Sequence, residues 1–479
     1  MLPIVAEPII KGLPAMPIKR CRSVVVAALT AGWLCGTVLV PAQAMTLEEA
    51  LALTYSTNPT LLAARAQLRV TDENVSQAKA GWRPTVTSSL SAGVTDTQGK
   101  SSGVTTTDAT KFPRTGRISI TQPVYTGGSV SATIAGSEAD VQAQRASMFS
   151  SEQTVLLQGV VTYVNVLREE ATLELQLNNL TRLQKQLEAT RDRFRVGEVT
   201  RTDVAQAEAR VSRARADRTQ AEGNLVTARV TFERIVGQVP DGVVRPGEPA
   251  GLPVSRPEAV DIALRDNFTL VQAKFTELSA RHAIDESEAA LYPKLSVVGQ
   301  AQKTFDTSGS DNEVTSLSAE LQLTIPIYQK GSEYSVIRQS KETANRSRLL
   351  VDSTRREVVD SVASAFESYQ TALARIDSLN AEVKSSEIAL DGVQQEATVG
   401  ARTVLDVLDA EQELLDGQVQ LVQAQRDAIV ASYQLLQAMG RLTAQDLGLP
   451  VEIYDYDSHY REVSGKLWGT DPTGRMPGN

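Results

Sequence analysis

Apolar side chains recur every three or four residues along two long stretches of this chain. Neither stretch contains a proline, since none occurs between Pro123 and Pro240 or between Pro326 and Pro450, and both are rich in good helix formers. Such spacing is that of a coiled coil, so long helices are predicted within residues 129–237 and 333–440. Three seams carry the spacing: Leu173, Leu177, Leu180, Gln184, Leu187, Arg191 and Phe194; Val204, Ala207, Val211, Ala214, Arg218, Ala221, Leu225, Ala228 and Phe232; and Val407, Ala410, Leu414, Gly417, Leu421, Ala424, Ala428, Ala431 and Leu435.

A shorter helical pattern precedes each long stretch. The first covers residues 47–82 and is broken at Pro59, because proline cannot donate the hydrogen bond that a helix interior needs. The second covers residues 257–292 and loosens near Asp266-Asn267.

Four runs between the helical parts have the composition or the alternation of strands. They are residues 85–94, 117–125, 294–303 and 315–328. In the last run, which is the clearest, the apolar residues fall on one face: Leu317, Ala319, Leu321, Leu323, Ile325 and Ile327. Polar loops at 95–115 and 304–314 are predicted to pair the runs into two hairpins, 85–125 and 294–328.

The pattern V-G-x-x-T-x-x-D-V-x-x-A-E occurs twice, at Val196–Glu208 and at Val399–Glu411, 203 positions apart. The chain is therefore one structural unit written twice. Val196-Gly197 and Val399-Gly400 are predicted to be turns between long helices, since glycine tolerates a positive φ.

This duplication predicts a first repeat at residues 45–240 and a second at 257–447, joined by a linker at 241–256. The tail at 448–479 is polar and rich in Gly, Pro, Asp and Tyr, so we expect it to be irregular and packed on the outside, or partly disordered.

Residues 1–44 are predicted to be an export signal that is removed. A basic stretch at 19–22 precedes an apolar run at 23–40, and Ala42-Gln43-Ala44 is a small-x-small cleavage site. The alternative is a transmembrane anchor. No later stretch is apolar for long enough to form a transmembrane helix.

Removal of this segment would also remove both cysteines, Cys21 and Cys35, and leave an exported chain without a disulfide. It would leave 44 basic and 56 acidic residues, a net charge of about −12. That sign argues against nucleic acid as a partner, because phosphate binding requires the opposite charge.

Four strands cannot close a barrel, and an open sheet edge cannot lie in lipid with its backbone groups unpaired. Either the hairpins form a soluble sheet, or several chains share one barrel. Two chains would supply eight strands, and three would supply twelve, with room for a channel. The export signal and the apolar face at 317–327 favour the shared barrel.

No cluster of side chains suggests catalysis or a resident cofactor. His282 and His459 are isolated, and the exported chain would contain no cysteine. The sequence therefore predicts neither an enzyme nor a structural metal site.

The duplicated unit, and above all the segment from Gly400 to Ala410, which reads G-A-R-T-V-L-D-V-L-D-A, resembles the TolC family of outer-membrane efflux proteins, and its branch without a lipid anchor. The resemblance covers the chain from Thr46 to about Leu447. It implies a mostly helical fold with a membrane β-barrel. In that fold, long coiled-coil helices form a periplasmic tunnel, and four strands per chain contribute to a twelve-stranded barrel shared by a homotrimer.

The same resemblance implies an exit duct in the outer membrane that extends into the periplasm. Such a duct passively conducts drugs, toxic compounds or proteins in tripartite efflux or type I secretion. Its partners would be a periplasmic adaptor protein, an inner-membrane pump of RND or ABC type, and outer-membrane lipid. Its periplasmic gate would open by an iris-like movement of the inner helix pair.

Residue roles also follow from the resemblance. Asp406 and Asp409 match an acidic ring at the tunnel entrance, where three chains would place six carboxylates that can bind a divalent cation. Arg402 matches an arginine that ties the gate shut, and Thr202 and Asp203 match its partners.

A tyrosine that forms a second tie in the family is replaced here by Ala397, so that tie is absent or replaced. The two turns, Val196-Gly197 and Val399-Gly400, match the tips that receive the adaptor. For Asp203 and Asp406 the alternative is a local role as first-turn acids, which the helix dipole favours.

Two other functional classes remain open at this point. A periplasmic coiled-coil adaptor or scaffold is the alternative to the duct, although the two duplicated helical units and two long hairpins speak against it. An enzyme on a repeat scaffold is the third class, and the missing catalytic cluster argues against it.

Overall fold

A computed structural model describes residues 45–101, 104–240, 242–306 and 312–471 of the 479-residue chain. The predicted export signal at 1–44, with Cys21 and Cys35, lies outside the described residues. The described residues belong to one compact unit.

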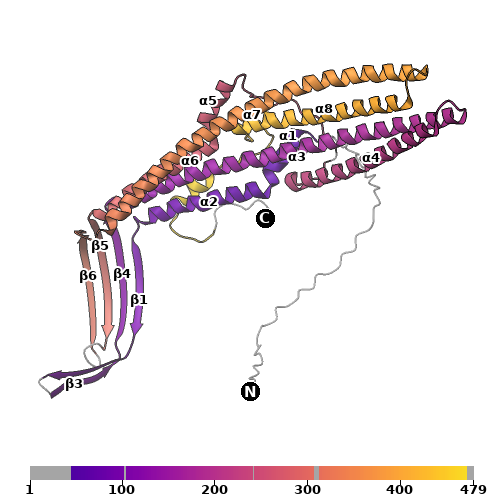
Figure 1. Ribbon diagram of the computed structural model, residues 1–479. Coiled ribbons are helices and arrows are strands. Elements are labelled where there is room, and N and C mark those ends of the chain that lie inside the picture. Colours follow the sequence, from indigo (N-terminus) through magenta and orange to yellow (C-terminus); the bar gives the residue numbers. More distant parts are fainter. Residues whose placement is uncertain (1–44, 102–103, 241, 307–311, 472–479) are drawn as a thin grey trace, which may run out of the picture. The chain divides into compact units, whose positions relative to one another are not determined.

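Both long helical stretches form a helix pair joined by a short turn (Figure 1). The first pair is α3 (Ser129–Arg195) and α4 (Arg201–Val236), and the second is α7 (Ser332–Thr398) and α8 (Val404–Met439). The helices have 67 and 36 residues in both copies, so the duplication extends to element length.

Burial confirms two of the three predicted seams. The buried members are Ala207, Val211, Ala214, Ala221, Leu225 and Phe232 in α4, and Val407, Leu414, Gly417, Ala424, Ala428, Ala431 and Leu435 in α8. The seam along α3 is wrong in part, because Leu177 and Phe194 are exposed. Packing within one chain buries the seams of α4 and α8, but it leaves these two side chains of α3 exposed.

The shorter helices break where the sequence predicted. Helix α1 (Leu47–Thr57) is followed by α2 (Pro59–Ala80), and α5 (Arg256–Asp266) by α6 (Phe268–Glu288) and the short 3-10 turn η1 (Ala289–Leu291).

Asn58 and Asn267 lie at the two breaks, and their side chains form equivalent hydrogen bonds in the two copies. Each side-chain oxygen caps the following helix, at 2.9 Å from the Thr60 amide and 3.0 Å from the Thr269 amide respectively. The side-chain amide of Asn58 donates to the Ile235 carbonyl, and that of Asn267 donates to the Ala438 carbonyl. Each break is therefore bonded to the end of the second long helix of its own repeat.

The main core gathers where these short helices pack on the middle of the long ones. Tyr163 and Phe232 are fully buried there, with ring centroids 6.3 Å apart. The Tyr163 hydroxyl lies 2.7 Å from the carbonyl oxygens of both Met45 and Val244. This contact holds the start of the described chain and the linker against α3.

Four antiparallel strands form one sheet in the order β1-β4-β5-β6. They are β1 (Thr85–Ala92), β4 (Arg114–Tyr125), β5 (Lys294–Phe305) and β6 (Glu313–Thr324). Both predicted hairpins are confirmed, and pairing of β4 with β5 joins the two repeats in one sheet.

Two strand predictions need correction. The expected loop at 95–115 instead contains a second hairpin, β2 (Thr95–Ser101) paired with β3 (Val104–Lys111), because this stretch is rich in β-branched threonine. The strand expected at 315–328 ends at Thr324, since Pro326 has no N–H to donate to a sheet.

The strand register separates the four-stranded sheet into an apolar and a polar face. The apolar face carries Val86, Leu90, Ile118, Ile120, Leu295, Val297, Ala301, Leu317, Ala319, Leu321 and Leu323. The polar face carries Thr87, Ser89, Arg117, Ser119, Gln300, Gln302, Ser316, Ser318, Glu320 and Gln322. Leu317 is 85 % exposed and Leu321 is 68 % exposed, so in one chain this apolar face is open.

Within the described ranges, no helix combines the length and apolar character needed to cross a membrane. Residues 448–471 of the tail are mostly irregular, as predicted, except for the short helix α9 (Ser458–Val463).

Paired glycines at the ends of α4 and α8 offer a test of this packing. Gly237 and Gly440 both adopt a positive φ, +90° and +84°. A Cβ at Gly440 would overlap the Asp266 backbone, whereas one at Gly237 would lie 3.2 Å from the Thr57 hydroxyl, a side-chain atom. We expect Gly237→Ala to destabilise the fold by roughly 1–2 kcal/mol and Gly440→Ala by more. Denaturant unfolding of the two variants compares them, and equal losses would contradict the packing described at α8.

Candidate functional site

The repeated thirteen-residue pattern forms the turns between the long helices. Val196 and Val399 end α3 and α7, and Gly197 and Gly400 follow with φ of +82° and +79°. The next amide returns to the helix, from Glu198 to the Arg193 carbonyl and from Ala401 to the Glu396 carbonyl, at 2.9 Å in both copies. The V-G of the pattern is therefore a helix-ending turn that requires a left-handed residue.

The T-x-x-D of the pattern is a capping box that starts the second helix. The Asp203 carboxylate accepts the Thr200 amide at 2.7 Å, and the Asp406 carboxylate accepts the Thr403 amide at 2.9 Å. Hydrogen bonds from Thr403 lower the pKa of the Asp406 carboxyl below its ordinary value. Both aspartates thus have the local role that the sequence left open, whatever else they do.

Among the described residues, no hydrogen bond or ion pair joins Arg402 to Thr202 or Asp203. Its guanidinium pairs with Glu396 at 2.8 Å, and both side chains are about half exposed. Val196 and Val399 are exposed at 72 % and 80 %, so both turn tips present an apolar side chain outward. The predicted gate tie and docking tips stay predictions.

A small apolar cluster joins the two helix pairs near the turns. Val404 and Leu408 of α8 are buried against residues of the first pair: Leu180, Leu183, Ala207, Val211 and Ala214. The corresponding positions in the first repeat, at the start of α4, are Arg201 and Ala205. The sequence shows this difference between the copies, but the shared pattern does not predict which of the unlike positions become buried.

An ion pair adds a second link between the pairs. Arg210 of α4 lies 2.5 Å from Asp409 of α8, with the arginine side chain 27 % exposed and the aspartate 58 % exposed. Asp409 was predicted as a ring residue, and its charge already has a partner within the chain.

Glu411 is the one residue of the repeated pattern whose environment differs strongly between the copies. It is 4 % exposed, and among the described residues its Oε2 has no hydrogen-bond partner. Burial raises the pKa of the Glu411 carboxyl, and Arg182 of α3 opposes that effect. Its counterpart Glu208 is solvent-accessible and pairs with Arg191 at 2.6 Å. A carboxyl that is costly to ionise therefore lies beside the apolar cluster.

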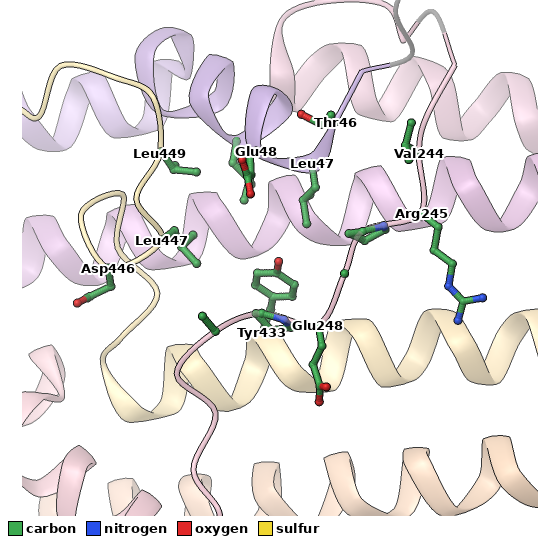
Figure 2. Close-up of a pocket in the computed structure, with 15 residues that line it drawn as sticks. Thr46, Leu47, Glu48, Val244, Arg245, Glu248, Tyr433, Asp446, Leu447 and Leu449 are labelled. Atoms are coloured by element: carbon green, nitrogen blue, oxygen red, sulfur yellow. The ribbon is translucent and has the colours of Figure 1, made fainter.

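No group of three or more His, Cys, Asp or Glu side chains within the described ranges is arranged to hold a metal ion. A cavity of about 460 Å³ lies away from the turns, between the start of α1, linker residues 244–250, α8 and residues 446–449 that follow it. Figure 2 shows the Tyr433 ring pointing from α8 into this cavity. Burial and the nearby Glu48 raise the pKa of Tyr433 to about 12, so its hydroxyl stays neutral.

Comparison with known proteins assigns this geometry to one family. The family described as outer membrane efflux protein matches residues 50–238 and 259–441, which are the two repeats. Outer membrane efflux protein BepC of Brucella suis is 36 % identical over 463 residues, covering 95 % of this chain and 99 % of BepC. Outer membrane protein TolC of Escherichia coli is 27 % identical over 315 residues, 62 % of this chain and 64 % of TolC.

Solved structures share the fold. CusC superposes with a TM-score of 0.73 at 16 % identity, covering 82 % of this chain and 92 % of CusC. The outer-membrane channel CmeC of Campylobacter jejuni gives 0.73 at 15 % identity, covering 88 % and 89 %. The chain thus shares its fold with these structures, and by its two matched repeats and its identity to BepC it belongs to the outer membrane efflux protein family.

Proposed function

We propose that this protein is the outer-membrane exit duct of a tripartite efflux or type I secretion system, and that it conducts its cargo passively. One observation carries the proposal: the sheet has an open apolar face, a polar face and two unpaired edges. A face of this kind suits lipid, and a polar opposite face suits a water-filled lumen.

Edge pairing leads to a homotrimer. Strands β1 and β6 each have one neighbour in the sheet, and their free backbone groups could not remain unpaired in lipid. Pairing of β6 with β1 of the next chain satisfies both edges, and three copies give twelve strands around a channel. The long helices of three chains would continue as a periplasmic tunnel.

Partners follow from the same role. We infer that a periplasmic adaptor binds the exposed turn tips at Val196-Gly197 and Val399-Gly400, and that an inner-membrane pump of RND or ABC type supplies the cargo. Relatives are named both for alkaline protease secretion and for cobalt-zinc-cadmium resistance, so the cargo class is set by the pump. A duct of this kind needs no catalytic group and no cofactor.

The gate is proposed to lie at the turns. In each chain the second helix pair is held against the first by the Val404 and Leu408 cluster and by the Arg210–Asp409 pair. We propose that this pair stands in for the tie that Ala397 cannot make. Opening would separate α8 from α4, with Arg402, Thr202 and Asp203 available for links between neighbouring chains.

Deletion of the gene tests the function. Susceptibility to drugs and metal ions and the secreted proteome are measured together, with a plasmid copy as the complement. We expect at least one of them to change and to be restored. A deletion that changes neither, or a product that purifies as a water-soluble single chain, would sink the proposal.

Arg210→Ala should favour the open gate. An exposed ion pair contributes about 0.5–1 kcal/mol, which would shift the closed-to-open ratio by roughly two- to five-fold per chain. Single-channel conductance in planar bilayers measures the shift. Arg213→Ala is the matched control, because Arg213 is on the same helix and, within the described residues, its one ion pair is with Asp217 of α4 itself. Equal conductance in both variants would argue against the tie.

Asp406→Asn tests the acidic ring separately from the helix cap. Asparagine can still accept the Thr403 amide, so the capping box survives while the charge is lost. We expect the preference for cations over anions to fall roughly two-fold. Asp203→Asn removes the equivalent charge from the first repeat. A similar fall in that control would show that the effect is general charge and not a ring.

Glu411→Gln should change how stability depends on pH. Because the pKa of Glu411 is raised above 4.5 in the folded chain, the stability that its protonated form contributes is present below pH 4.5 and is lost as pH rises through the raised value. Near neutral pH the variant should therefore melt at a higher temperature, because its free energy of unfolding is larger by about 1–3 kcal/mol. Its melting temperature should also vary less with pH in the acid range. Melting temperatures measured across pH check this, and Glu208→Gln, at the exposed equivalent position of the first repeat, is the matched control. An equal change in both variants would contradict the role of burial at Glu411.

A further inference from the structure

The chain after α8 forms a strap that is fastened to the first repeat by aromatic and cationic side chains. Residues 450–471 follow the second repeat, yet they bond to α1, α2 and α3 of the first. The Tyr454 amide donates to the Tyr55 hydroxyl at 3.1 Å. The Arg65 guanidinium lies over the rings of both Tyr55 and Tyr454, at 4.3 and 5.1 Å. These contacts make the strap part of the fold.

Further along, α9 is docked by a second set of contacts. His459 is 8 % exposed, and its Nδ1 lies 3.1 Å from a carboxylate oxygen of the fully buried Asp72. The Arg145 guanidinium of α3 lies 5.1 Å from the centre of the Tyr456 ring and 5.6 Å from that of Tyr460. Val463 is completely buried. The direction of the strap beyond Val463 is therefore set by its anchorage.

The strap then reaches the end of the sheet where the strands join the helices. Arg83 donates to the Lys466 carbonyl at 3.1 Å, and Arg83 is two residues before β1 begins. The adjoining Trp82 carbonyl accepts the Gln122 side-chain amide of β4 at 2.9 Å. Lys466 is thus held at the level of the last residues of β4, where the apolar face of the sheet starts.

The next two residues are apolar and open. Leu467 is 63 % exposed and Trp468 is 88 % exposed. Other aromatic residues near the same end of the sheet are also exposed: Trp82, Tyr125, Tyr292 and Tyr328. Tyr125 pairs with Leu295 and so lies on the apolar face. Tryptophan and tyrosine at the border of an apolar band are typical of the membrane interface, where the ring meets lipid and the N–H or O–H meets water.

We propose that Leu467 and Trp468 form an interfacial anchor that enters the periplasmic leaflet of the outer membrane, with phospholipid as the occupant of this surface. The anchor rests on the proposed membrane location of the sheet. The anchor adds a lipid contact outside the strands. It lies after the second repeat, on a strap that is bonded to the first repeat. It would fix the depth at which the helix-to-strand junction lies below the bilayer.

Tryptophan fluorescence tests the anchor directly. The sequence contains Trp33, Trp82 and Trp468, and removal of the predicted export signal leaves the last two. Trp82→Phe therefore makes Trp468 the only tryptophan of the exported chain. This variant is reconstituted as the full trimer in vesicles of phosphatidylcholine and phosphatidylglycerol in which the phosphatidylcholine is brominated near the headgroup or near the chain end.

We expect bromine near the headgroup to quench Trp468 by roughly half, as for an interfacial ring, and bromine near the chain end to quench it less. Quenching only by aqueous iodide would overturn the anchor, because Trp468 would then face water. A blue-shifted emission in detergent trimers with no effect of brominated lipid would also overturn it, because a neighbouring chain would cover the site.

A reporter on the sheet separates failure of the anchor from failure of the duct. Leu321→Trp, combined with Trp82→Phe and Trp468→Phe, places a single tryptophan on the apolar face. Quenching of this reporter without quenching of Trp468 would reject the anchor and leave the membrane location intact. If neither is quenched, the sheet is not in lipid and the proposed function fails with it.

Discussion

Unpaired backbone groups at the two edges of the sheet constrain everything else in this protein. Strands β1 and β6 each leave one row of N–H and C=O groups without a neighbour, beside a face of exposed leucine, isoleucine and valine. In water the apolar face is unfavourable, and in lipid each unpaired edge group costs several kcal/mol. Closure with strands from sister chains pairs the edge groups, and lipid around the closed barrel then covers the apolar face. A single chain therefore builds its core around the helices and leaves both faces of the sheet for the assembly.

Most of the architecture occurs in both copies of the duplicated unit. Helix lengths, glycine-ended helices, capping boxes and the asparagines at Asn58 and Asn267 all occur in both copies. The copies differ where they meet, since α8 begins with Val404 and buries Leu408 where α4 has Arg201 and Ala205. Two like helix pairs in one chain contact each other through unlike surfaces, so this divergence is what lets the second pair pack against the first.

Charged side chains at the turns bond firmly within each helix pair and only weakly between the two pairs. Asp203 and Asp406 close the turns from within, and Arg402 pairs with Glu396 of its own turn. Each helix pair is thus complete by itself at its tip. Near the turns, beyond the main core, the links between the pairs are a small apolar cluster and one partly exposed ion pair, with a buried carboxyl that is costly to ionise beside them. Contacts of this strength suit an assembly whose closed and open forms differ by little free energy.

Local features were determined by the sequence alone. The long helices, the breaks at Asn58 and Asn267, the turns at Gly197 and Gly400 and the two hairpins depend on residues a few positions apart, so periodicity and turn chemistry predict them. The resemblance to the family added the prediction of a duct, which periodicity alone does not support. Tertiary structure decided the rest: the β2–β3 hairpin, the incomplete α3 seam, the burial of Glu411 and Leu408, and the path of the strap to Arg83. Those outcomes depend on which distant elements come into contact, and burial of a side chain is a property of that contact and not of its neighbours along the chain.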